Sequence, residues 1–284
     1  MTTVVTGATG HVGRLTIEAL IARGVAPTDI VATGRRVETL GGLTARGVAV
    51  RRADYDDPAT LDDAFAGATK LLFVSGSDVG RRLPQHRNVV DAAVRAGVRH
   101  LVYTSGPRAD LSNLPVNPDH KATEEYIAAS GIPATMLRNN WYHENYLPDL
   151  ATARAGGEIV SATGTGRIAS ASRADYAEGA AAVLTQDGHE KKVYELGGDS
   201  AWDYDELVAT LSQIVGHEVV RRDVTPDERH ALLLAAGLPD DVAGFVVALD
   251  TAIAHGALAD VTGDLSRLIG RPTTPLATTL AAAG

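Results

Sequence analysis

The stretch TGATGHVG, residues 6–13, decides the fold class of this 284-residue chain. It spaces Gly7, Gly10 and Gly13 at three-residue intervals between an apolar run, TVVT (3–6), and an amphipathic stretch, VGRLTIEALIARG (12–24). In a strand–loop–helix unit the first glycine permits a tight turn, the second lets backbone amides approach a pyrophosphate, and the third lets the helix pack closely on the strand. The helix N-terminus then faces the anion. This context predicts a dinucleotide-binding loop formed by Gly7, Ala8, Thr9, Gly10, His11, Val12 and Gly13.

Apolar, strand-like runs alternate with helix-like stretches through the first half of the chain. The strand-like runs are TVVT (3–6), DIVAT (29–33), VAVRR (48–52), KLLFVS (70–75), HLVYTS (100–105) and ATMLRN (134–139). The helix-like stretches between them are residues 12–24, 36–47, 58–67, 84–97 and 118–131. Nearly all-apolar strands in this order predict an α/β fold, a Rossmann-type doubly wound parallel sheet with helices on both faces.

The second half of the chain is less regular. It has one more strand-like run, KVYELGG (192–198), and helix-like stretches at 174–186, 203–215, 226–236 and 239–255. We therefore expect an NAD(P)-binding Rossmann domain over residues 1–150. Residues 151–284 should form a smaller, mainly helical, substrate-binding lobe that shares the last strands of the sheet.

Composition and charge argue against several classes of protein. The net charge is −9 and no basic run exceeds a pair, which is unlike a nucleic-acid-binding surface. The chain has no cysteine, so disulfides and thiolate metal sites are excluded, and its histidines lack metal-site spacing. No signal peptide is apparent, and the most apolar later run, VAGFVVAL (242–249), is too short to span a bilayer. We expect a cytoplasmic protein without a metal.

Arg35 and Arg36 follow the second strand, where an acidic residue usually binds the ribose 2′-hydroxyl of NADH. An arginine pairs well with a 2′-phosphate. We therefore expect NADPH to be preferred, the alternative being a solvated surface pair.

The ends of the third and fourth strands supply further candidates. Asp54 and Tyr55 follow the third strand, where a carboxylate could accept a hydrogen bond from the adenine amine, while Asp57 before Pro58 is typical of a helix N-cap. The fourth strand ends in small residues that would let the ribose and nicotinamide approach the backbone: Ser75, Gly76 and Ser77.

Several longer strings resemble one family in the same order along the chain. They are TGATGHVG, RRADYDDPATL, KLLFVSGSDVGRRLPQHRNVV, AGVRHLVYTS, MLRNNWYHENYL, IASASRADYA, GHEKKVYELGGDSAW and SRLIGRPTTPL. Over nearly its whole length the chain resembles the NmrA-like, atypical short-chain dehydrogenase/reductase family. Within that family it looks most like the type 2 NAD(P)H:quinone oxidoreductases and the related triphenylmethane dye reductases.

The resemblance implies cofactor contacts beyond the glycine loop. It implies Arg35, residues 75–77, the neighbourhood of Arg173, and the segment Asn139, Asn140, Trp141, Tyr142, His143 and Glu144. The family often has glycine where Asn140 stands and a small residue where His143 stands. We therefore expect the pocket beside the nicotinamide to depart from the family shape.

The aromatic residues of that segment have two interpretations. Trp141 and Tyr142 could stack on a flat acceptor, with asparagine amides fixing a carbonyl. Alternatively, Trp141 and Tyr146 are core anchors of the second lobe, because large aromatics are mostly buried.

The segment DHKATEEYI (119–127) stands where short-chain dehydrogenases carry a Tyr-x-x-x-Lys proton donor, and this chain lacks that spacing. It has His120 and Glu124, which share one helical face. One interpretation makes His120 a proton donor oriented by Glu124, since histidine titrates near neutral pH. The other makes the pair a helix-surface contact. We favour the second, because a quinone is easily reduced and its oxygens can take protons from water.

The rest of that helix reads as ordinary packing. Ala122, Tyr126 and Ala129 are expected to form the buried stripe, and Lys121 to be solvated.

We predict an NADPH-dependent oxidoreductase that transfers hydride directly to a quinone-like acceptor, without flavin or metal. Two alternatives stay open: an NmrA-like regulator that binds NADP and senses redox state without turnover, and a reductase of a dye-like conjugated acceptor. The expected partner is a small molecule rather than a nucleic acid or a membrane. The sequence leaves a homodimer open.

Overall fold

The computed structural model describes residues 1–78, 80–111 and 113–283. Within these residues the largest element is a seven-stranded sheet with the order β3-β2-β1-β4-β5-β6-β8, and every neighbouring pair is parallel. Its strands are β1 (Thr3–Val5), β2 (Ile30–Gly34), β3 (Ala49–Arg52), β4 (Lys70–Phe73), β5 (His100–Ser105), β6 (Ala134–Asn139) and β8 (Val193–Leu196). The strand order reverses between β1 and β4, which is the switch point of a Rossmann fold. The predicted fold class is confirmed.

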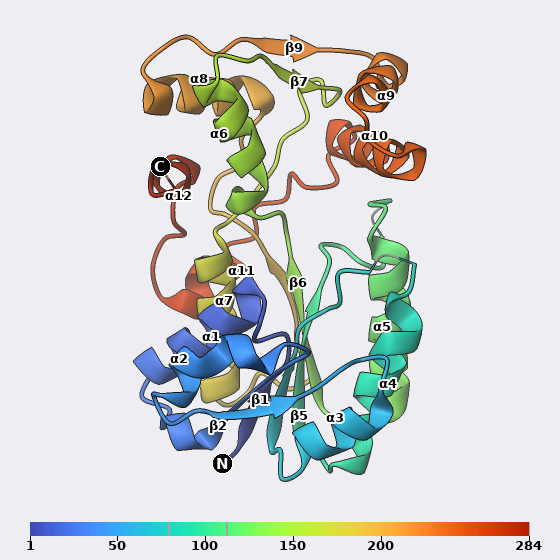
Figure 1. The fold of residues 1–284 in the computed structure, drawn as a ribbon, viewed down its shortest axis with the longest axis vertical. Helices are drawn as coiled ribbons and strands as arrows, with labels where there is room; N and C mark the ends of the chain where they lie inside the picture. The colour runs from blue at the N-terminus through green and yellow to red at the C-terminus, as the bar shows by residue number, and fades with distance from the viewer. Residues whose placement is uncertain (79, 112, 284) are drawn as a thin grey trace.

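Helices cover both faces of the sheet (Figure 1). One face carries α1 (His11–Ala22), α2 (Gly41–Thr44), α7 (Arg173–Thr185) and α11 (Asp264–Ile269), and the other carries α3 (Pro58–Phe65), α4 (Arg82–Arg95) and α5 (Asn117–Ser130). Each layer buries its own apolar core against the sheet, which is why the central strands are apolar on both faces. We call the sheet and these seven helices the sheet part.

The remaining elements form an upper lobe, residues 147–161, 204–254 and 276–281. They are α6 (Leu147–Arg154), α8 (Tyr204–Val215), α9 (Pro226–Ala235), α10 (Asp240–Ala254), α12 (Leu276–Ala281) and the two-stranded parallel sheet of β7 (Ile159–Ser161) and β9 (Arg221–Asp223). A third apolar core holds the lobe to the segment after β6, with Tyr146 edge-to-face on Trp202 at 4.7 Å between ring centroids. No helix in the described residues has the length and apolarity needed to cross a bilayer.

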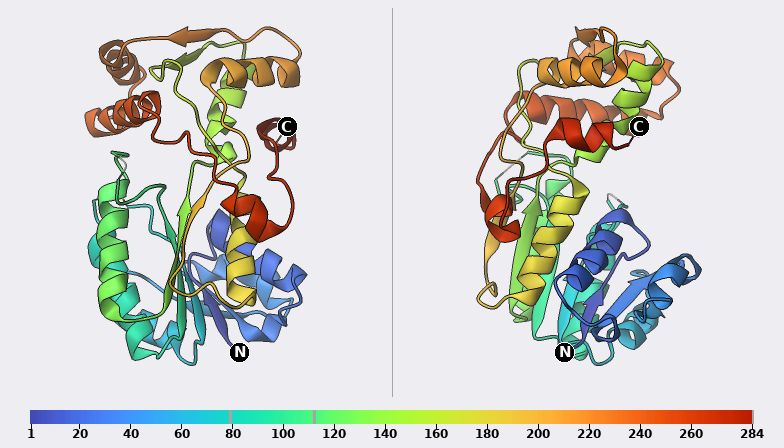
Figure 2. Two further views of the ribbon diagram at one scale, coloured as in Figure 1. Left: turned by 180° about the vertical axis from the view of Figure 1, so that it is seen from behind. Right: turned by 90° about the vertical axis from the view of Figure 1, so that its left-hand side faces the viewer.

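The chain passes between the sheet part and the upper lobe five times: after β6, before α7, after β8, before α11 and after α11. Figures 1 and 2 show these connecting segments between the two parts. Residues after 150 thus complete the sheet, because β8 pairs with β6 and α7 packs on α1.

The sequence was wrong about the extent of one helix. Residues 36–47, predicted as a helix, form only a 3₁₀ turn, η2 (Val37–Leu40), and the four-residue α2. Two adjacent glycines, Gly41 and Gly42, lower the helix propensity of this stretch. Two further 3₁₀ turns are η1 (Pro27–Asp29) and η3 (His143–Tyr146).

Candidate functional site

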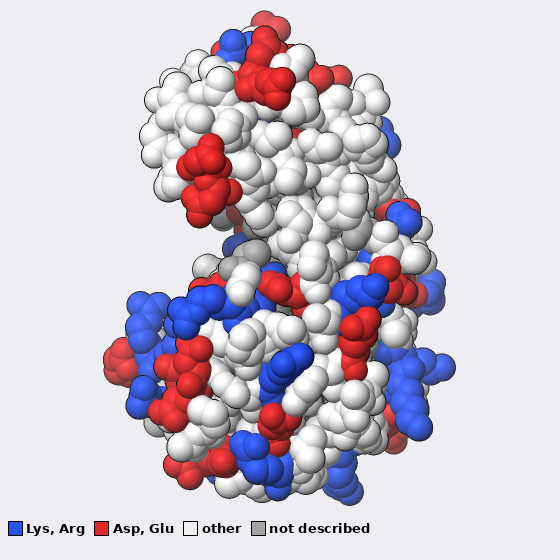
Figure 3. All heavy atoms as spheres, turned by 90° about the vertical axis from the view of Figure 1, so that its right-hand side faces the viewer, with Lys and Arg blue, Asp and Glu red and all other residues white. Residues whose placement is uncertain are grey.

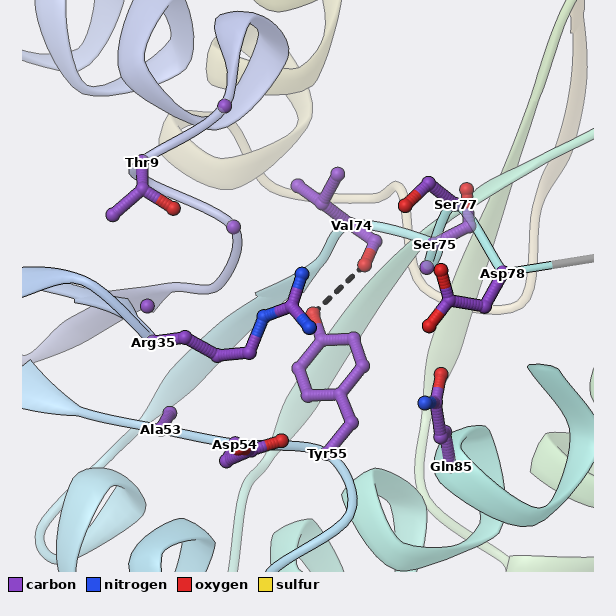
Figure 4. A pocket seen from close by; sticks show the side chains of 14 residues that line it. Thr9, Arg35, Ala53, Asp54, Tyr55, Val74, Ser75, Ser77, Asp78 and Gln85 are labelled. Carbon is purple, nitrogen blue, oxygen red and sulfur yellow. Dashed lines mark hydrogen bonds between the residues drawn. The ribbon is translucent and has the colours of Figure 1, made fainter. Parts of the chain in front are cut away.

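A cavity of about 250 Å³ lies at the carboxyl ends of the strands on either side of the switch point. Figure 4 shows the side chains that line it. Nine of the residues predicted to bind the cofactor line this cavity: Gly7, Thr9, Gly10, Arg35, Asp54, Tyr55, Ser75, Gly76 and Ser77. They come from the ends of four separate strands, so the fold brings together residues that are up to 70 positions apart in the sequence.

The glycine loop has the geometry that the motif requires. Gly7 has a φ of +62°, a left-handed conformation that favours glycine. A Cβ on Gly13 would stand 2.5 Å from the carbonyl oxygen of Gly7, so only glycine lets α1 approach the strand this closely. Gly10 occupies the N-cap of α1 and no side chain caps the helix, which leaves its first amides open to an anion.

The other members of the loop lie around the cavity rather than in its lining. Ala8 is fully buried and its amide donates to the carbonyl of Thr33, while Val12 packs under the first turn of α1. His11 is exposed at the start of the helix.

Arg35 extends from the end of β2 along the cavity (Figure 4). In the described part of the chain, no carboxylate forms an ion pair with Arg35 or with the exposed Arg36 beside it. The positive charge of Arg35 is therefore available to an anionic group in the cavity.

Tyr55 is held firmly against the floor of the cavity. Its hydroxyl donates to the carbonyl of Val74 at 2.8 Å and lies 2.6 Å from the hydroxyl of Thr6. Burial raises the pKa of Tyr55 well above its usual range, so the ring is neutral and acts as a wall. Neighbouring Asp54 accepts from the amide of Asp56 at 3.2 Å.

Asp57 takes the predicted N-cap position of α3, with Pro58 in the first turn, yet its side chain makes no capping hydrogen bond. The hydroxyl of Thr60 instead donates to the Asp57 carbonyl at 2.7 Å.

The Ser75–Ser77 turn, residues 75–77, is fixed from beneath by neighbouring elements. The amide of Ser75 donates to the hydroxyl of Thr104 at 2.9 Å, and the amide of Gly76 donates to Nε2 of His86 at 3.0 Å. The carbonyl of Gly76 accepts from Nε of Arg82 at 2.7 Å. The backbone of Gly76 is therefore occupied internally, and only the open side of the turn faces the cavity.

The cavity also includes residues that the sequence did not single out: Gly34, Ala53, Val74, Asp78 and Gln85. Gly34 could have been found from the sequence, because it directly follows an apolar run. The structure shows why glycine stands there: a Cβ on Gly34 would stand 2.7 Å from the Thr9 methyl. Gln85 comes from α4 and reaches the site only through tertiary packing.

The segment after β6 adjoins this site without lining the cavity. His143 is buried; its ring nitrogens contact the Thr279 hydroxyl at 2.9 Å and the Ser170 carbonyl at 3.0 Å. The side-chain amide nitrogen Nδ2 of Asn140 donates to the carbonyl of Leu258 at 3.1 Å. Asn140 and His143, the two residues that differ from the family pattern, thus form hydrogen bonds to segments that come later in the chain. Neither side chain lines the cavity of the glycine loop, and their effect on the pocket beside the nicotinamide stays a prediction.

The other residues of this segment form a compact polar and aromatic group. Glu144 accepts from the backbone amide of Arg173 at 3.0 Å and so caps α7. The guanidinium of Arg173 lies 5.2 Å from the centre of the Tyr142 ring. Asn139 is buried, and its side-chain oxygen has no hydrogen-bond partner among the described residues. An orphaned amide oxygen at a strand end fits a hydrogen bond from a ligand.

Trp141 is partly buried and packs against the core of the upper lobe, and Tyr146 is buried within that core. The anchor interpretation is confirmed for Tyr146.

His120 and Glu124 do not pair as either interpretation required. The carboxylate of Glu124 binds Arg138 through two hydrogen bonds, of 2.9 and 2.7 Å, and accepts from the Ser105 hydroxyl at 2.6 Å. His120 is buried against β5, and its Nδ1 lies 2.8 Å from the hydroxyl of Tyr103. The pair is therefore neither an acid with its orienting carboxylate nor a surface contact.

The reason is that α5 packs with a different face than predicted. Its buried residues are Asn117, His120, Thr123 and Ile127, whereas Ala122, Tyr126 and Ala129 are partly or fully exposed. The sheet receives polar side chains here, so the apolar stripe misled the prediction. Lys121 is exposed, as expected.

The two histidines beneath the site are neutral. Burial, with the nearby charge of Arg82, lowers the pKa of His86 to about 3. Burial, Arg82 and His86 lower the pKa of His120 to about 3. Among the described residues, no group of three or more histidine and carboxylate side chains is arranged to hold a metal.

The sheet, the glycine loop and the cavity define a dinucleotide-binding protein of the Rossmann type. Residues 7–187 match a family described as NAD(P)H-binding. Quinone oxidoreductase 2 of Escherichia coli (strain K12) is 46% identical over 273 residues, which cover 96% of this chain and 95% of that protein. The chain belongs to the NAD(P)H-binding family, in its NmrA-like group.

Two solved structures are similar over their whole length. The crystal structure of the NADPH-dependent quinone oxidoreductase of Escherichia coli complexed with NADPH has a TM-score of 0.95 and 45% identity, covering 100% of this chain and 99% of that chain. The Citrobacter sp. triphenylmethane reductase complexed with NADP(H) has a TM-score of 0.94 and 40% identity, covering 100% of both chains.

Proposed function

We propose that this protein is an NADPH-dependent oxidoreductase that reduces a quinone-like acceptor by direct hydride transfer. The observation that carries the proposal is the cavity itself, where a glycine loop with an open helix N-terminus meets an arginine free of ion pairs within the described chain. The similarity to a quinone oxidoreductase over 96% of the chain supports the same acceptor class.

Each part of the cavity suits one part of the cofactor. We assign the pyrophosphate to the glycine loop, the 2′-phosphate to Arg35, and the adenine to the side of Asp54 and Tyr55. The ribose and nicotinamide would follow residues 75–77 toward Asn139, whose orphaned oxygen can accept from the carboxamide. When bound, NADPH supplies the hydride. The chain's own residues bind and orient the reactants and limit the access of water.

We place the acceptor between the sheet part and the upper lobe. Figure 3 shows the surface deeply hollowed there, with Lys and Arg side chains along the lower side of the hollow. Tyr142, three residues after the end of β6, would present an aromatic wall for a flat acceptor. In this proposal residues 1–150 provide most of the cofactor site, and the upper lobe provides acceptor binding.

A dye-like conjugated acceptor is a second candidate, supported by the 40% identity to a triphenylmethane reductase. Its reduction needs the same hydride donor and differs only in the shape and charge of the acceptor.

Purified protein mixed with NADPH and a panel of benzoquinones, naphthoquinones and cationic dyes should consume NADPH with at least one quinone. The loss of NADPH absorbance measures the reaction. Tight NADP binding without turnover of any acceptor would instead support the redox-sensing regulator.

The remaining parts of the proposal are a flavin-free enzyme, a cytoplasmic location, in keeping with the cysteine-free chain, and a homodimer. Flavin absorbance of the purified protein and its mass by light scattering test the first and the last.

A further inference from the structure

A chain of hydrogen bonds runs from the cofactor side of the sheet to His120. It begins at the amide of Gly76, which donates to His86 Nε2 at 3.0 Å. His86 Nδ1 lies 2.8 Å from the hydroxyl of Thr123, whose own hydrogen goes to the carbonyl of Asp119 at 2.7 Å. The hydroxyl of Tyr103 lies 2.8 Å from His120 Nδ1 and 3.5 Å from His86 Nδ1.

The chain fixes which nitrogen of His86 carries the proton. A backbone amide only donates, so Nε2 of His86 accepts and its proton lies on Nδ1, directed at Thr123. That nitrogen cannot also accept from Tyr103. Its hydroxyl can instead donate to Nδ1 of His120, which places the proton of His120 on Nε2.

Nε2 of His120 has no hydrogen-bond partner among the described residues. Nε2 is not fully buried either. The fully buried side-chain atoms that lack a partner are Arg82 Nη1, His100 Nδ1, Asn117 Oδ1, Asn139 Oδ1 and Tyr146 Oη. This side of the ring therefore keeps some access to the outside. It lies at the carboxyl end of β5, because a Cβ on Gly106 would stand 3.0 Å from His120 Cδ2.

We propose that neutral His120 donates a hydrogen bond from Nε2 to the carbonyl oxygen of the acceptor. This role rests on the proposed function, since it needs an acceptor that carries such an oxygen. It differs from the proton donor considered from the sequence. The ring keeps its proton, and Tyr103 and His86 are positioning residues that hold its tautomer.

The chemistry balances without a net proton from the ring. The quinone gains two electrons and one hydrogen from the hydride that NADPH supplies, and negative charge develops on a quinone oxygen. That oxygen then takes one proton from water, which completes the hydroquinone and leaves NADP⁺. A fixed donor aimed at the oxygen stabilises the developing charge without reorganising.

The tautomer can be measured without turnover. In ¹⁵N-labelled protein at neutral pH, the imidazole spectrum of His120, assigned by its loss in the His120→Gln variant, should show a protonated Nε2 and an unprotonated Nδ1. The Tyr103→Phe variant should show both tautomers, because the constraint is removed. A proton on Nδ1, or on both nitrogens, in the wild-type protein would overturn the proposal.

Kinetics separate the donor from a packing role. His120→Leu fills the space without a donor and should lower kcat with a quinone roughly 10- to 100-fold, with little change in KM. His120→Gln retains an N–H and should stay within roughly threefold of wild type. NADPH binding by fluorescence titration should be unchanged in both. A kcat for His120→Leu equal to wild type, or equal losses in both variants, contradicts the role. A wild-type protein that reduces no quinone defeats the proposed function, whereas the ring spectrum decides the tautomer independently.

Discussion

Arg35 and Arg36 are neighbours in the sequence, and only Arg35 lines the cavity. Arg35→Ala should weaken NADPH binding roughly 10- to 100-fold, the value of a charge-assisted hydrogen bond to the 2′-phosphate. NADH lacks that phosphate, so its affinity should hardly change. Isothermal titration with both cofactors measures the difference.

Arg36→Ala is the matched control, because it removes the same charge from an exposed position outside the cavity. Equal losses of NADPH and NADH affinity in Arg35→Ala would contradict the assignment of the 2′-phosphate.

Five buried histidines of the described chain make stability depend on pH. Burial lowers the pKa of His86 and of His120 to about 3, and that of His143 to about 4, from an unfolded value of 6.5. Burial also lowers the pKa of His100 and of His189. Below pH 6.5 the unfolded chain binds protons that the folded chain does not, so the free energy of unfolding should fall as pH decreases. Asp149 opposes this, because burial raises its pKa to about 6 and the folded state is protonated first.

Asp250 also opposes the fall in stability, because burial raises its pKa. The histidines outnumber the two carboxyl groups, so the net loss should be a few kcal/mol per pH unit near about pH 5, with no histidine contribution above neutrality. Urea unfolding across this range measures it. His143→Gln should reduce the slope by about 1.4 kcal/mol per pH unit, the share of one histidine. A wild-type stability that does not change in this range would show that the rings take up protons while folded.

The meeting of the glycine loop, Arg35 and the strand-end residues at one cavity could be predicted, because strand, glycine loop and helix follow each other directly in the sequence. The environment of His120 could not. Its partners, Tyr103 and His86, lie 17 and 34 residues away, and only the packing of α4 and α5 on the sheet brings the rings together. The buried face of α5 is mostly polar, so the pattern of apolar residues in the sequence does not indicate which face packs on the sheet.

At the scale of elements, Arg138 joins three parts of the fold. It extends from β6 to Glu124 on α5, Glu195 on β8 and Asp110 in the loop between β5 and α5. Burial opposes its charge, but hydrogen bonds to the carboxylates of Glu124 and Glu195 raise its pKa above the ordinary value. The side chains of Arg138 and Glu124 are only 10% and 13% exposed, so the pair is screened little by solvent.

Arg138→Met should lower the free energy of unfolding by about 3 kcal/mol, because it leaves the largely shielded carboxylate of Glu124 without its ion-pair partner. Urea denaturation measures the loss. Arg95→Met removes an exposed pair with Asp62, half-open to solvent, and should cost less than about 1 kcal/mol. Similar losses in both variants would show that the buried network adds nothing specific.

Long, patterned elements were predicted well, and short ones were not. Every strand of the main sheet was found, because each is an apolar run bounded by polar or glycine residues. β7 and β9 have three residues each, and β9 reads RRD, so neither shows a strand pattern. Their pairing depends on the upper lobe that surrounds them.

At the scale of the whole molecule, the five passages of the chain should couple the unfolding of both parts. Both tryptophans, Trp141 and Trp202, contact the core of the upper lobe, so fluorescence reports that region while circular dichroism reports all helices. The two thermal transitions should coincide, because neither part is built from one continuous stretch of chain. Separate midpoints would contradict this coupling.

A chain ended at residue 150 tests the same point directly. It lacks α7, β8 and α11, whose apolar side chains complete one core of the sheet part. We expect it to be unfolded or aggregated by circular dichroism and sedimentation. A folded, monomeric fragment that binds NADPH would show that the Rossmann portion stands alone.

Because β8 is made long after β6, the edge of β6 stays unpaired for a time during synthesis. The end of β8 lies 57 residues after the end of β6, although the two strands pair edge to edge. At ~5–20 residues per second, a ribosome needs roughly 3–11 s to make that stretch. During this time the hydrogen-bonding edge of β6 has no partner strand and can pair with another chain. A ribosome that stalls between the two strands therefore holds a nascent chain prone to aggregation, and chaperones that cover strand edges should bind it during that interval.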